Sequence, residues 1–199
     1  MLLTRQNILS RKHWVFDMDG TLTIAKHDFD GIREELGLPV GLPILESIAK
    51  LPDEEATAVN RRLDEIELQI AERSEPAGGA AELLEALLSQ GAKIGILTRN
   101  NAINIHVTLK AAGLLHYFAQ DDLISRDCIA PKPAPDGIHH LLNNWQAEVN
   151  DAVMVGDSIH DLNAGRNAQT ATIYLDTSGE FQFKDTADLC VRHLSELIL

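Results

Sequence analysis

Short apolar runs alternate with amphipathic segments along most of this chain. After a first run that ends at Phe16, strand-like apolar runs are expected at 93–97, 123–124, 152–155, 172–175 and 188–191. Predicted helices fill the intervals at 80–90, 102–112, 135–145 and 161–169. Short apolar strands separated by helices of this length indicate a parallel sheet with helices on both faces. The pattern therefore predicts an α/β protein.

One long segment interrupts this alternation. Between the first strand and the next, the sequence has helical periodicity, with predicted helices at 28–36, 44–51 and 53–73. In the third, apolar residues recur at steps of four, three and four and so share one face: Val59, Leu63, Ile66 and Ile70. A segment of about fifty residues is at the lower limit for a domain. We therefore expect a small α-helical cap domain at 24–76, inserted into a core domain made of 1–23 and 77–199.

Charge and cysteine usage narrow the classes of partner. A formal net charge of −13 argues against a nucleic-acid or anionic-membrane surface, because either would need a basic patch. Cys128 and Cys190 have no metal-ligand spacing, and we interpret them as reduced, buried thiols. Such thiols fit the cytoplasm, and no segment resembles a signal peptide or approaches membrane-spanning length. The expectation is a cytoplasmic protein without nucleic-acid or membrane partners, its oligomeric state open.

Two carboxylates follow the first apolar run. Asp17 lies where the strand should stop, and Asp19 can face the same way because extended backbone repeats every second residue. Gly20 allows the chain to leave the strand through backbone angles that other residues avoid. Two such close anions repel one another, and Mg2+ would relieve that cost because it prefers carboxylate oxygens. The simpler alternative is an acidic turn with both carboxylates in solvent.

Other polar residues follow later strands. Thr98 directly follows one apolar run, and Asp157 follows another after Gly156. The carboxyl ends of parallel strands meet at one edge of the sheet, where ligands bind. The loop that contains Lys132 can reach the same edge. Each residue also has an ordinary interpretation: Thr98, Asp157 or Asp161 can cap a helix, and Lys132 can be a solvated loop lysine. Four such coincidences at strand ends are improbable together.

These motifs, in this order, resemble the haloacid dehalogenase superfamily, in its phosphatase branch and near the phosphoglycolate phosphatases. The residues that carry the resemblance are Asp17-Met18-Asp19-Gly20-Thr21, then Thr98, then Lys132, then Gly156-Asp157-Ser158-Ile159-His160-Asp161. The resemblance implies a Rossmann-like parallel sheet with a small inserted helical cap. Dehalogenases of the superfamily resemble this chain at the first carboxylate but lack the second, so Asp19 points to phosphate chemistry. The predicted cap is shorter than in phosphoglycolate phosphatases, which leaves the substrate open.

The resemblance also implies roles for individual residues. Asp17 would be the nucleophile that forms an aspartyl-phosphate, and Asp19 would be the general acid and base. Lys132 would neutralise the transferring group, and Thr98 and Arg99 would bind the substrate phosphate. Mg2+ would be held by the Asp17 and Asp157 carboxylates and by the backbone carbonyl of Asp19. Asp161 would be a direct ligand or lie in the second coordination shell.

The expected function is a Mg2+-dependent phosphoric monoester hydrolase for a small phosphorylated metabolite. Other enzyme activities that share this chemistry are a phosphomutase and a pyrophosphatase. An alternative of another class is a non-catalytic binding or regulatory module, which would be expected to have lost one carboxylate or the lysine. Cap residues with charged side chains could select the substrate: Lys26, His27, Arg33, Arg61 and Arg62.

Overall fold

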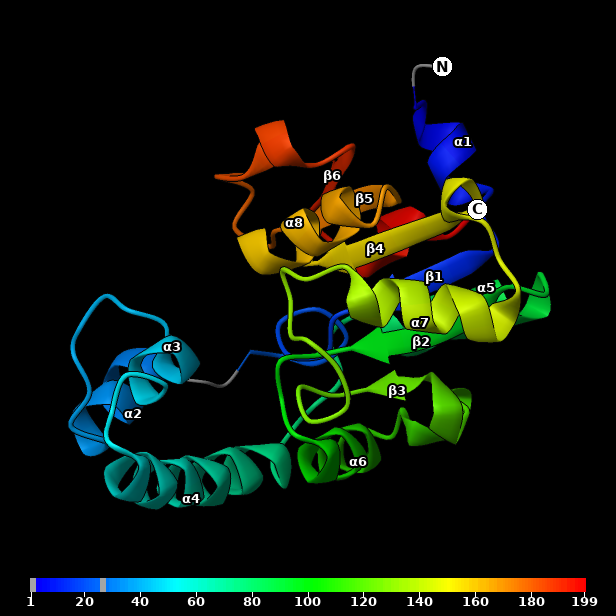
Figure 1. The fold of residues 1–199 in the computed structure, drawn as a ribbon. Helices are drawn as coiled ribbons and strands as arrows, with labels where there is room; N and C mark the ends of the chain where they lie inside the picture. The colour runs from blue at the N-terminus through cyan, green and yellow to red at the C-terminus, as the bar shows by residue number, and fades with distance from the viewer. Residues whose placement is uncertain (1–2, 26–27) are drawn as a thin grey trace.

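The computed structural model describes residues 3–25 and 28–199. Six parallel strands form one sheet in the order β3-β2-β1-β4-β5-β6. The strands are β1 (His13–Phe16), β2 (Lys93–Leu97), β3 (Leu123–Ile124), β4 (Ala152–Gly156), β5 (Ala171–Leu175) and β6 (Leu189–Val191). The first strand of the chain is therefore central, between β2 and β4 (Figure 1).

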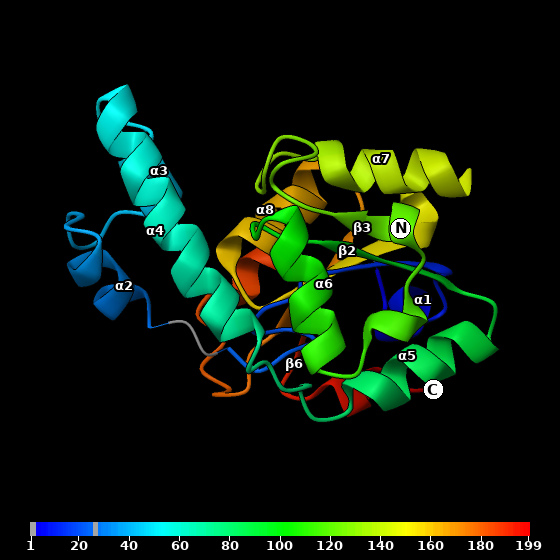
Figure 2. The ribbon, with the colours of Figure 1, turned by 90° about the horizontal axis from the view of Figure 1, so that it is seen from below.

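Helices cover both faces of the sheet. The helices of the described residues are α1 (Arg5–Leu9), α2 (Phe29–Glu35), α3 (Ile44–Ile48), α4 (Asp53–Ala71), α5 (Ala80–Ser89), α6 (Ala102–Ala111), α7 (Asp136–Trp145) and α8 (Ile159–Asn167). Short 3₁₀ turns are η1 (Leu115–Tyr117), η2 (Gln120–Asp122), η3 (Val149–Asp151), η4 (Lys184–Thr186) and η5 (Leu194–Leu197). Figure 2 shows α7 and α8 on the opposite side of the sheet from α5. The predicted α/β, Rossmann-like sheet covered on both faces is confirmed.

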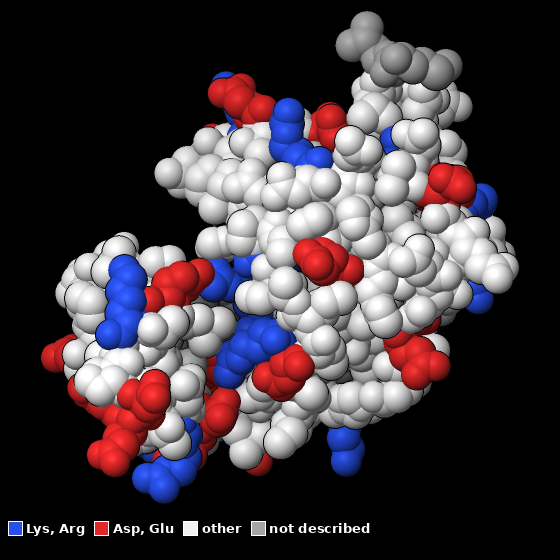
Figure 3. Space-filling model, viewed as in Figure 1, with Lys and Arg blue, Asp and Glu red and all other residues white. Residues whose placement is uncertain are grey.

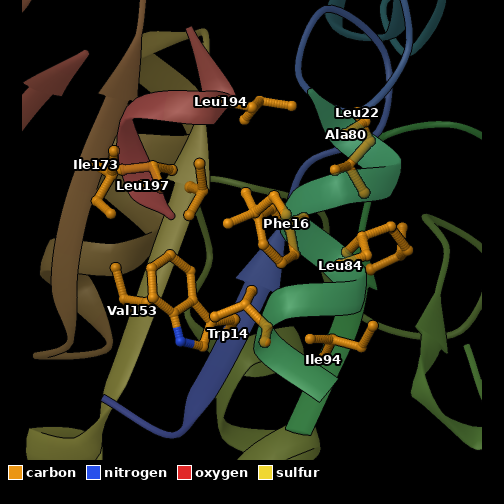
Figure 4. Close-up of a cluster of buried hydrophobic side chains, with 14 of the residues drawn as sticks. Trp14, Phe16, Leu22, Ala80, Leu84, Ile94, Val153, Ile173, Leu194 and Leu197 are labelled. Carbon is orange, nitrogen blue, oxygen red and sulfur yellow. The ribbon is translucent and has the colours of Figure 1, made fainter. Parts of the chain in front are cut away.

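The alternation of side chains along β1 supplies both faces of the core. Trp14 and Phe16 point to one face, where they pack with α5 and η5 (Figure 4). Val15 points to the other, where it belongs to a cluster with residues of α7 and α8. All three side chains are fully buried, and the Trp14 indole donates to the Arg11 carbonyl oxygen at 2.9 Å. Burial on both faces holds the end of β1 in a fixed place.

The register of the sheet aligns three strand ends. Phe16 lies opposite Ile96 of β2 and Val155 of β4. The Asp17 N–H continues the ladder by donating to the Val155 carbonyl oxygen at 2.9 Å. The residues that follow β1, β2 and β4 therefore emerge at the same edge, as the sequence predicted.

Helices α2, α3 and α4 form a separate cluster beside this edge, which we call the cap. Its buried apolar residues are Ile32, Leu36, Leu38, Ile48, Leu63 and Ile66. In Figures 1 and 2 the cap lies to one side of the sheet, and its longest helix, α4, extends to α6 of the core and contacts it. The division into a cap domain at 24–76 and a core domain at 1–23 and 77–199 stays a prediction.

The structure differs from the sequence-based expectation in three places. Helix α1 was not expected; Thr4 caps it, with its side chain accepting from the Asn7 N–H. Helix α8 begins at Ile159 rather than 161. The thiols are not buried as predicted, because Cys128 is exposed and Cys190 is half-buried; both are free. Among the helices of the described residues, none has the length and apolar character needed to cross a membrane.

Candidate active site

The loop after β1 contains a glycine, Gly20, at a position where no larger side chain would fit. Gly20 has a φ of +86°, in the region that favours glycine. A Cβ at this position would lie 2.1 Å from Asp157 Oδ2, so the loop and the end of β4 approach each other more closely than any side chain would permit. The glycine thereby brings the loop that carries Asp17 and Asp19 against Asp157.

Lys132 is the positive centre of the site. Its ammonium nitrogen lies 2.5 Å from Asp17 Oδ1 and 2.5 Å from Asp161 Oδ1. Lys132 is only 3% exposed, so the alternative of a solvated loop lysine is wrong. Burial alone would lower the pKa of Lys132, but Asp161 and Asp17 together raise it above its ordinary value. The lysine is therefore charged and fixed between two carboxylates.

The carboxylates outnumber this single cation. One oxygen from each of Asp17, Asp157 and Asp161 lies within 4.8 Å of the others. Burial, followed by repulsion from Asp161, raises the pKa of Asp17 well above its usual range. The same two causes raise the pKa of Asp157 to about 7. This excess of buried negative charge fits a divalent cation with oxygen ligands, such as Mg2+.

Asp161 has a different environment from the other two. Its Oδ2 accepts from the Ser158 N–H at 2.9 Å and from the Ser158 hydroxyl at 2.6 Å, which caps α8. Its Oδ1 faces the Lys132 ammonium, and the residue is fully buried. The helix-cap alternative therefore holds for Asp161, but not for Asp157, because Ser158 is the cap residue. Since Asp161 Oδ2 accepts two hydrogen bonds and Oδ1 forms an ion pair with Lys132, this side chain is better placed to hold Lys132 than to ligate a metal ion.

The end of β2 contributes a polar network. The Asn100 N–H donates to Thr98 Oγ1 at 3.0 Å, so the Thr98 hydroxyl proton is left to donate elsewhere. Asn100 Oδ1 accepts from the Asn101 N–H at 3.0 Å and from Asn104 Nδ2 at 2.9 Å. These two donors fix the Asn100 amide so that its Nδ2 donates to Asp19 Oδ2 at 3.3 Å. Thr98 does not cap α6, since Asn101 does.

Two arginines connect this edge of the core to the cap. Arg99 pairs with Glu46 of α3 at 2.6 Å. Arg126 pairs with Asp64 and Glu67 of α4, each at 3.1 Å, and donates to the Arg99 carbonyl oxygen at 3.2 Å. The cap is thus held over the strand ends by charged groups from both sides.

A cavity of about 420 Å³ lies between cap and core. Its core side includes the predicted site residues Asp17, Asp19, Thr98, Arg99, Lys132 and Asp157. Basic side chains gather in the hollow between the two parts in Figure 3. The volume is at the lower end of the range for small-molecule sites.

The structure brings the predicted residues together with few exceptions. Asp161 is fully buried, contacts the Lys132 ammonium and is not part of the cavity lining. Of the cap residues proposed to select the substrate, Arg33 lines the cavity, whereas Arg62 pairs with Glu35 and Glu65 on the cap surface. Arg61 is exposed and lines a different hollow, between α4 and α6. Lys26 and His27 lie outside the described residues.

Asp64 and Glu67 of α4 were not identified from the sequence as the partners of Arg126. Nor was Asn104, which donates to the Asn100 side-chain oxygen. Glu67 follows Ile66 and lies four residues after Leu63, so it belongs to the inward face of the third cap helix. A carboxylate on the apolar face of a helix is a signal that it has a buried partner. That signal was available in the sequence, although the identity of the partner, Arg126, was not.

A substitution at Gly20 tests the close approach of the two loops. We expect Gly20→Ala to lower the melting temperature, because the new methyl group displaces Asp157, and to abolish any rise in melting temperature that added Mg2+ causes in the wild type. The clash should cost about 1–3 kcal/mol beyond backbone strain. Gly91→Ala is the matched control, since Gly91 has a φ of +75° and nothing within 4 Å of its Cβ position. Equal decreases of the melting temperature in Gly20→Ala and Gly91→Ala would contradict the close approach of the two loops.

Comparison with known proteins gives four findings. The model of the haloacid dehalogenase-like hydrolase family matches residues 14–175. An uncharacterized hydrolase of Saccharomyces cerevisiae is 29% identical over 200 residues, covering 97% of this chain and 92% of that protein. A pyrophosphatase of Listeria monocytogenes is 36% identical over 95 residues, covering 47% of this chain and 43% of that protein. The crystal structure of a predicted phosphoglycolate phosphatase from Haemophilus somnus has the same fold, with a TM-score of 0.76 and 20% identity over 98% of this chain and 97% of that one.

Proposed function

The chain belongs to the haloacid dehalogenase-like hydrolase family. From this membership and the site geometry, we propose that it is a Mg2+-dependent phosphatase that hydrolyses small phosphoric monoesters through an aspartyl-phosphate. The observation that carries the proposal is the Lys132 ammonium, which lies 2.5 Å from Asp17 at the floor of a cavity that Asp19 and Asp157 also line.

The donor set suits the metal. Asp17 and Asp157 would hold Mg2+ together with the Asp19 backbone carbonyl, and Asp161 would hold Lys132 beside them. When bound, Mg2+ supplies positive charge to the phosphoryl oxygens and keeps the carboxylates ionised. A cation is what this group of carboxylates lacks, as the raised pKa values of Asp17 and Asp157 indicate.

In the first step Asp17 acts as the nucleophile. One Asp17 oxygen attacks phosphorus while the bond from phosphorus to the leaving-group oxygen breaks on the opposite side. Asp19 gives its proton to that oxygen, so that the alcohol departs neutral. Lys132 holds the other Asp17 oxygen, which fixes the attacking carboxylate in one orientation.

In the second step water hydrolyses the aspartyl-phosphate. Asp19, now ionised, takes a proton from the water as its oxygen attacks phosphorus, and the bond between Asp17 and phosphorus breaks. Asp17 returns as a carboxylate and inorganic phosphate leaves. Throughout both steps, the Thr98 hydroxyl and the Arg99 backbone N–H donate to phosphoryl oxygens, and the Lys132 ammonium stabilises their charge.

Asn100 positions the acid and base. We expect Asn100→Asp to lower kcat about 10-fold, because the acceptor for Asn101 and Asn104 is kept while the donor to Asp19 is replaced by an anion. Inhibition by inorganic phosphate, which measures phosphate binding alone, should weaken by a smaller factor than kcat, because the new anion repels the bound phosphate without taking part in proton transfer. Loss of phosphate binding in parallel with kcat would assign Asn100 to general folding of the loop instead.

Release of inorganic phosphate from an aryl phosphate tests the proposed function. Turnover is expected with Mg2+, should stop on addition of EDTA, and should return when Mg2+ is restored in excess. Absence of turnover with Mg2+, or turnover that EDTA leaves unchanged, would contradict the proposal.

A pyrophosphatase is the second candidate, because the Listeria pyrophosphatase matches nearly half of this chain. Supplying pyrophosphate in the same assay separates the two activities. A phosphomutase would return an isomerised sugar phosphate instead of free phosphate. A non-catalytic binding module is disfavoured, since the carboxylates and the lysine are all present.

A further inference from the structure

We infer that the cap selects substrates whose leaving group is neutral and largely apolar. Substrates that carry a second anionic group besides the reacting phosphate are disfavoured. This inference rests on the proposed function and extends it to the substrate class. It follows from the apolar wall that the cap presents to the cavity and from the balance of charges around it.

The cavity has two chemically different sides. Its core side carries the carboxylates, Thr98 and Lys132 described above. Its cap side is apolar and is formed by Phe29, Leu42, Pro43, Ile44, Leu45 and Leu63. A phosphate bound at Asp17 therefore directs its leaving group toward this apolar wall.

Two of these apolar side chains are open to solvent. Phe29 is 55% exposed and Leu42 is 41% exposed, although the cap has a packed interior of its own. Leu42 is held over the cavity by its backbone, since its carbonyl oxygen accepts from Arg33 Nε at 2.9 Å. Apolar surface fixed in the wall of a ligand cavity favours an apolar group that covers it.

The cations around the cavity are already paired. Arg33 bonds to Asp30 at 2.8 Å, in addition to its contact with Leu42. Arg99 and Arg126 bind the cap carboxylates described above, and Lys132 binds Asp17 and Asp161. Within the described part of the chain, every cationic side chain that lines the cavity therefore has a carboxylate partner.

The overall charge leads to the same conclusion. Among the described residues, four carboxylates line the cavity (Asp17, Asp19, Glu67 and Asp157), and so do four cations (Arg33, Arg99, Arg126 and Lys132). Four more carboxylates that do not line the cavity, Asp30, Glu46, Asp64 and Asp161, pair with these cations. The groups around the cavity therefore carry a net negative charge, which a bound Mg2+ and a phosphoric monoester of about −2, together neutral, do not offset. A second anionic group on the substrate would be left without compensation in a partly enclosed space. Pyrophosphate and phosphoglycolate each carry such a group.

The test compares two substrates that differ by one remote charge. Benzyl phosphate and 4-carboxybenzyl phosphate have similar leaving oxygens, because the carboxylate lies across the ring from the ester. With Mg2+, we expect wild-type kcat/KM to be at least about 10-fold higher for benzyl phosphate, which corresponds to about 1.4 kcal/mol. Pyrophosphate should be the poorest of the three.

A pair of variants assigns this preference to the cap wall. Leu42→Arg adds a cation to the wall and should reduce the ratio of kcat/KM for benzyl phosphate over 4-carboxybenzyl phosphate about 5-fold. Val40→Arg should leave this ratio unchanged. Val40 is 85% exposed in the same loop and does not line the cavity, so it controls for charge and loop structure. Circular dichroism is used to check that both variants fold, and the wild-type ratio of kcat/KM for the two benzyl substrates is a test that does not depend on the variants.

The outcomes separate the two proposals. Faster hydrolysis of 4-carboxybenzyl phosphate or pyrophosphate, equal rates for the two benzyl substrates, or equal effects of the two arginine variants would overturn the inference while leaving the phosphatase intact. No phosphate release from any of the three substrates would overturn the phosphatase proposal itself.

Discussion

Asp17→Asn is expected to reduce phosphate release by at least about 10⁴-fold, because the amide cannot attack phosphorus and no neighbouring carboxylate can replace it. The fold should be retained. The side chain keeps its shape, and the substitution removes one of the mutually repelling carboxylates whose crowding raises the pKa of Asp17. Without Mg2+, the melting temperature of the variant should equal or exceed that of the wild type.

The covalent intermediate provides a second measurement. Acid quenching during turnover of a phosphate-labelled substrate should leave label on wild-type protein, on the peptide that contains Asp17, and none on Asp17→Asn. Asp151→Asn is a suitable control, since it makes the same chemical change just before β4, at the opposite end of that strand from the cavity. Normal turnover by Asp17→Asn, or label on another residue, would contradict the assigned nucleophile.

Lys132→Met is expected to cause the largest loss of stability together with a large loss of activity. The substitution leaves Asp17 and Asp161 facing each other without the ammonium that lies 2.5 Å from each. Removing one partner of a buried ion pair costs about 3–5 kcal/mol of unfolding free energy. Loss of the cation beside the phosphoryl group should lower kcat roughly 10³-fold.

The pH dependence of this loss has a defined sign. Carboxylates that lose their cation bind protons more tightly in the folded than in the unfolded protein, so the folded state is favoured as the pH falls. The deficit of Lys132→Met should therefore be smaller at pH 5 than at pH 8, as measured by urea denaturation. Mg2+ should restore part of the stability by binding the folded state, without restoring turnover.

An exposed lysine provides the comparison. Lys110 lies on the solvent side of α6, and Lys110→Met should change the unfolding free energy by less than about 0.5 kcal/mol. If Lys132→Met unfolds at the same urea concentration as Lys110→Met, the pairing of Lys132 with the two carboxylates does not contribute to stability as described.

The sequence was sufficient to predict where the strand ends meet, because apolar runs of β1, β2 and β4 each stop at a polar residue. It was also sufficient for the three cap helices, whose periodicity is regular. It did not predict α1, a single short turn whose Thr4 cap is a weak signal. The prediction that Cys128 is buried was wrong, because its exposure depends on the position of the loop after β3 and not on residue type.

Contacts between distant segments were beyond sequence reasoning for a different reason. The pairs of Arg99 with Glu46 and of Arg126 with Glu67 join the cap to the core, and charged residues on helices are usually solvated. Arg99 was assigned from the sequence to the substrate phosphate because it follows Thr98, but Glu46 and Glu67 were not identified as partners of these arginines. Leu42 was missed similarly, since an apolar residue in a loop is not by itself a signal of a ligand.

The central place of β1 in the sheet has a consequence for how the protein folds. This strand is made first, yet its two neighbours are β2, which begins at Lys93, and β4, which begins at Ala152. Pairings between such widely separated segments form slowly, because large loops must close before any contact compensates for the lost chain entropy. During refolding from denaturant, the recovery of enzyme turnover should therefore follow the appearance of helical circular dichroism.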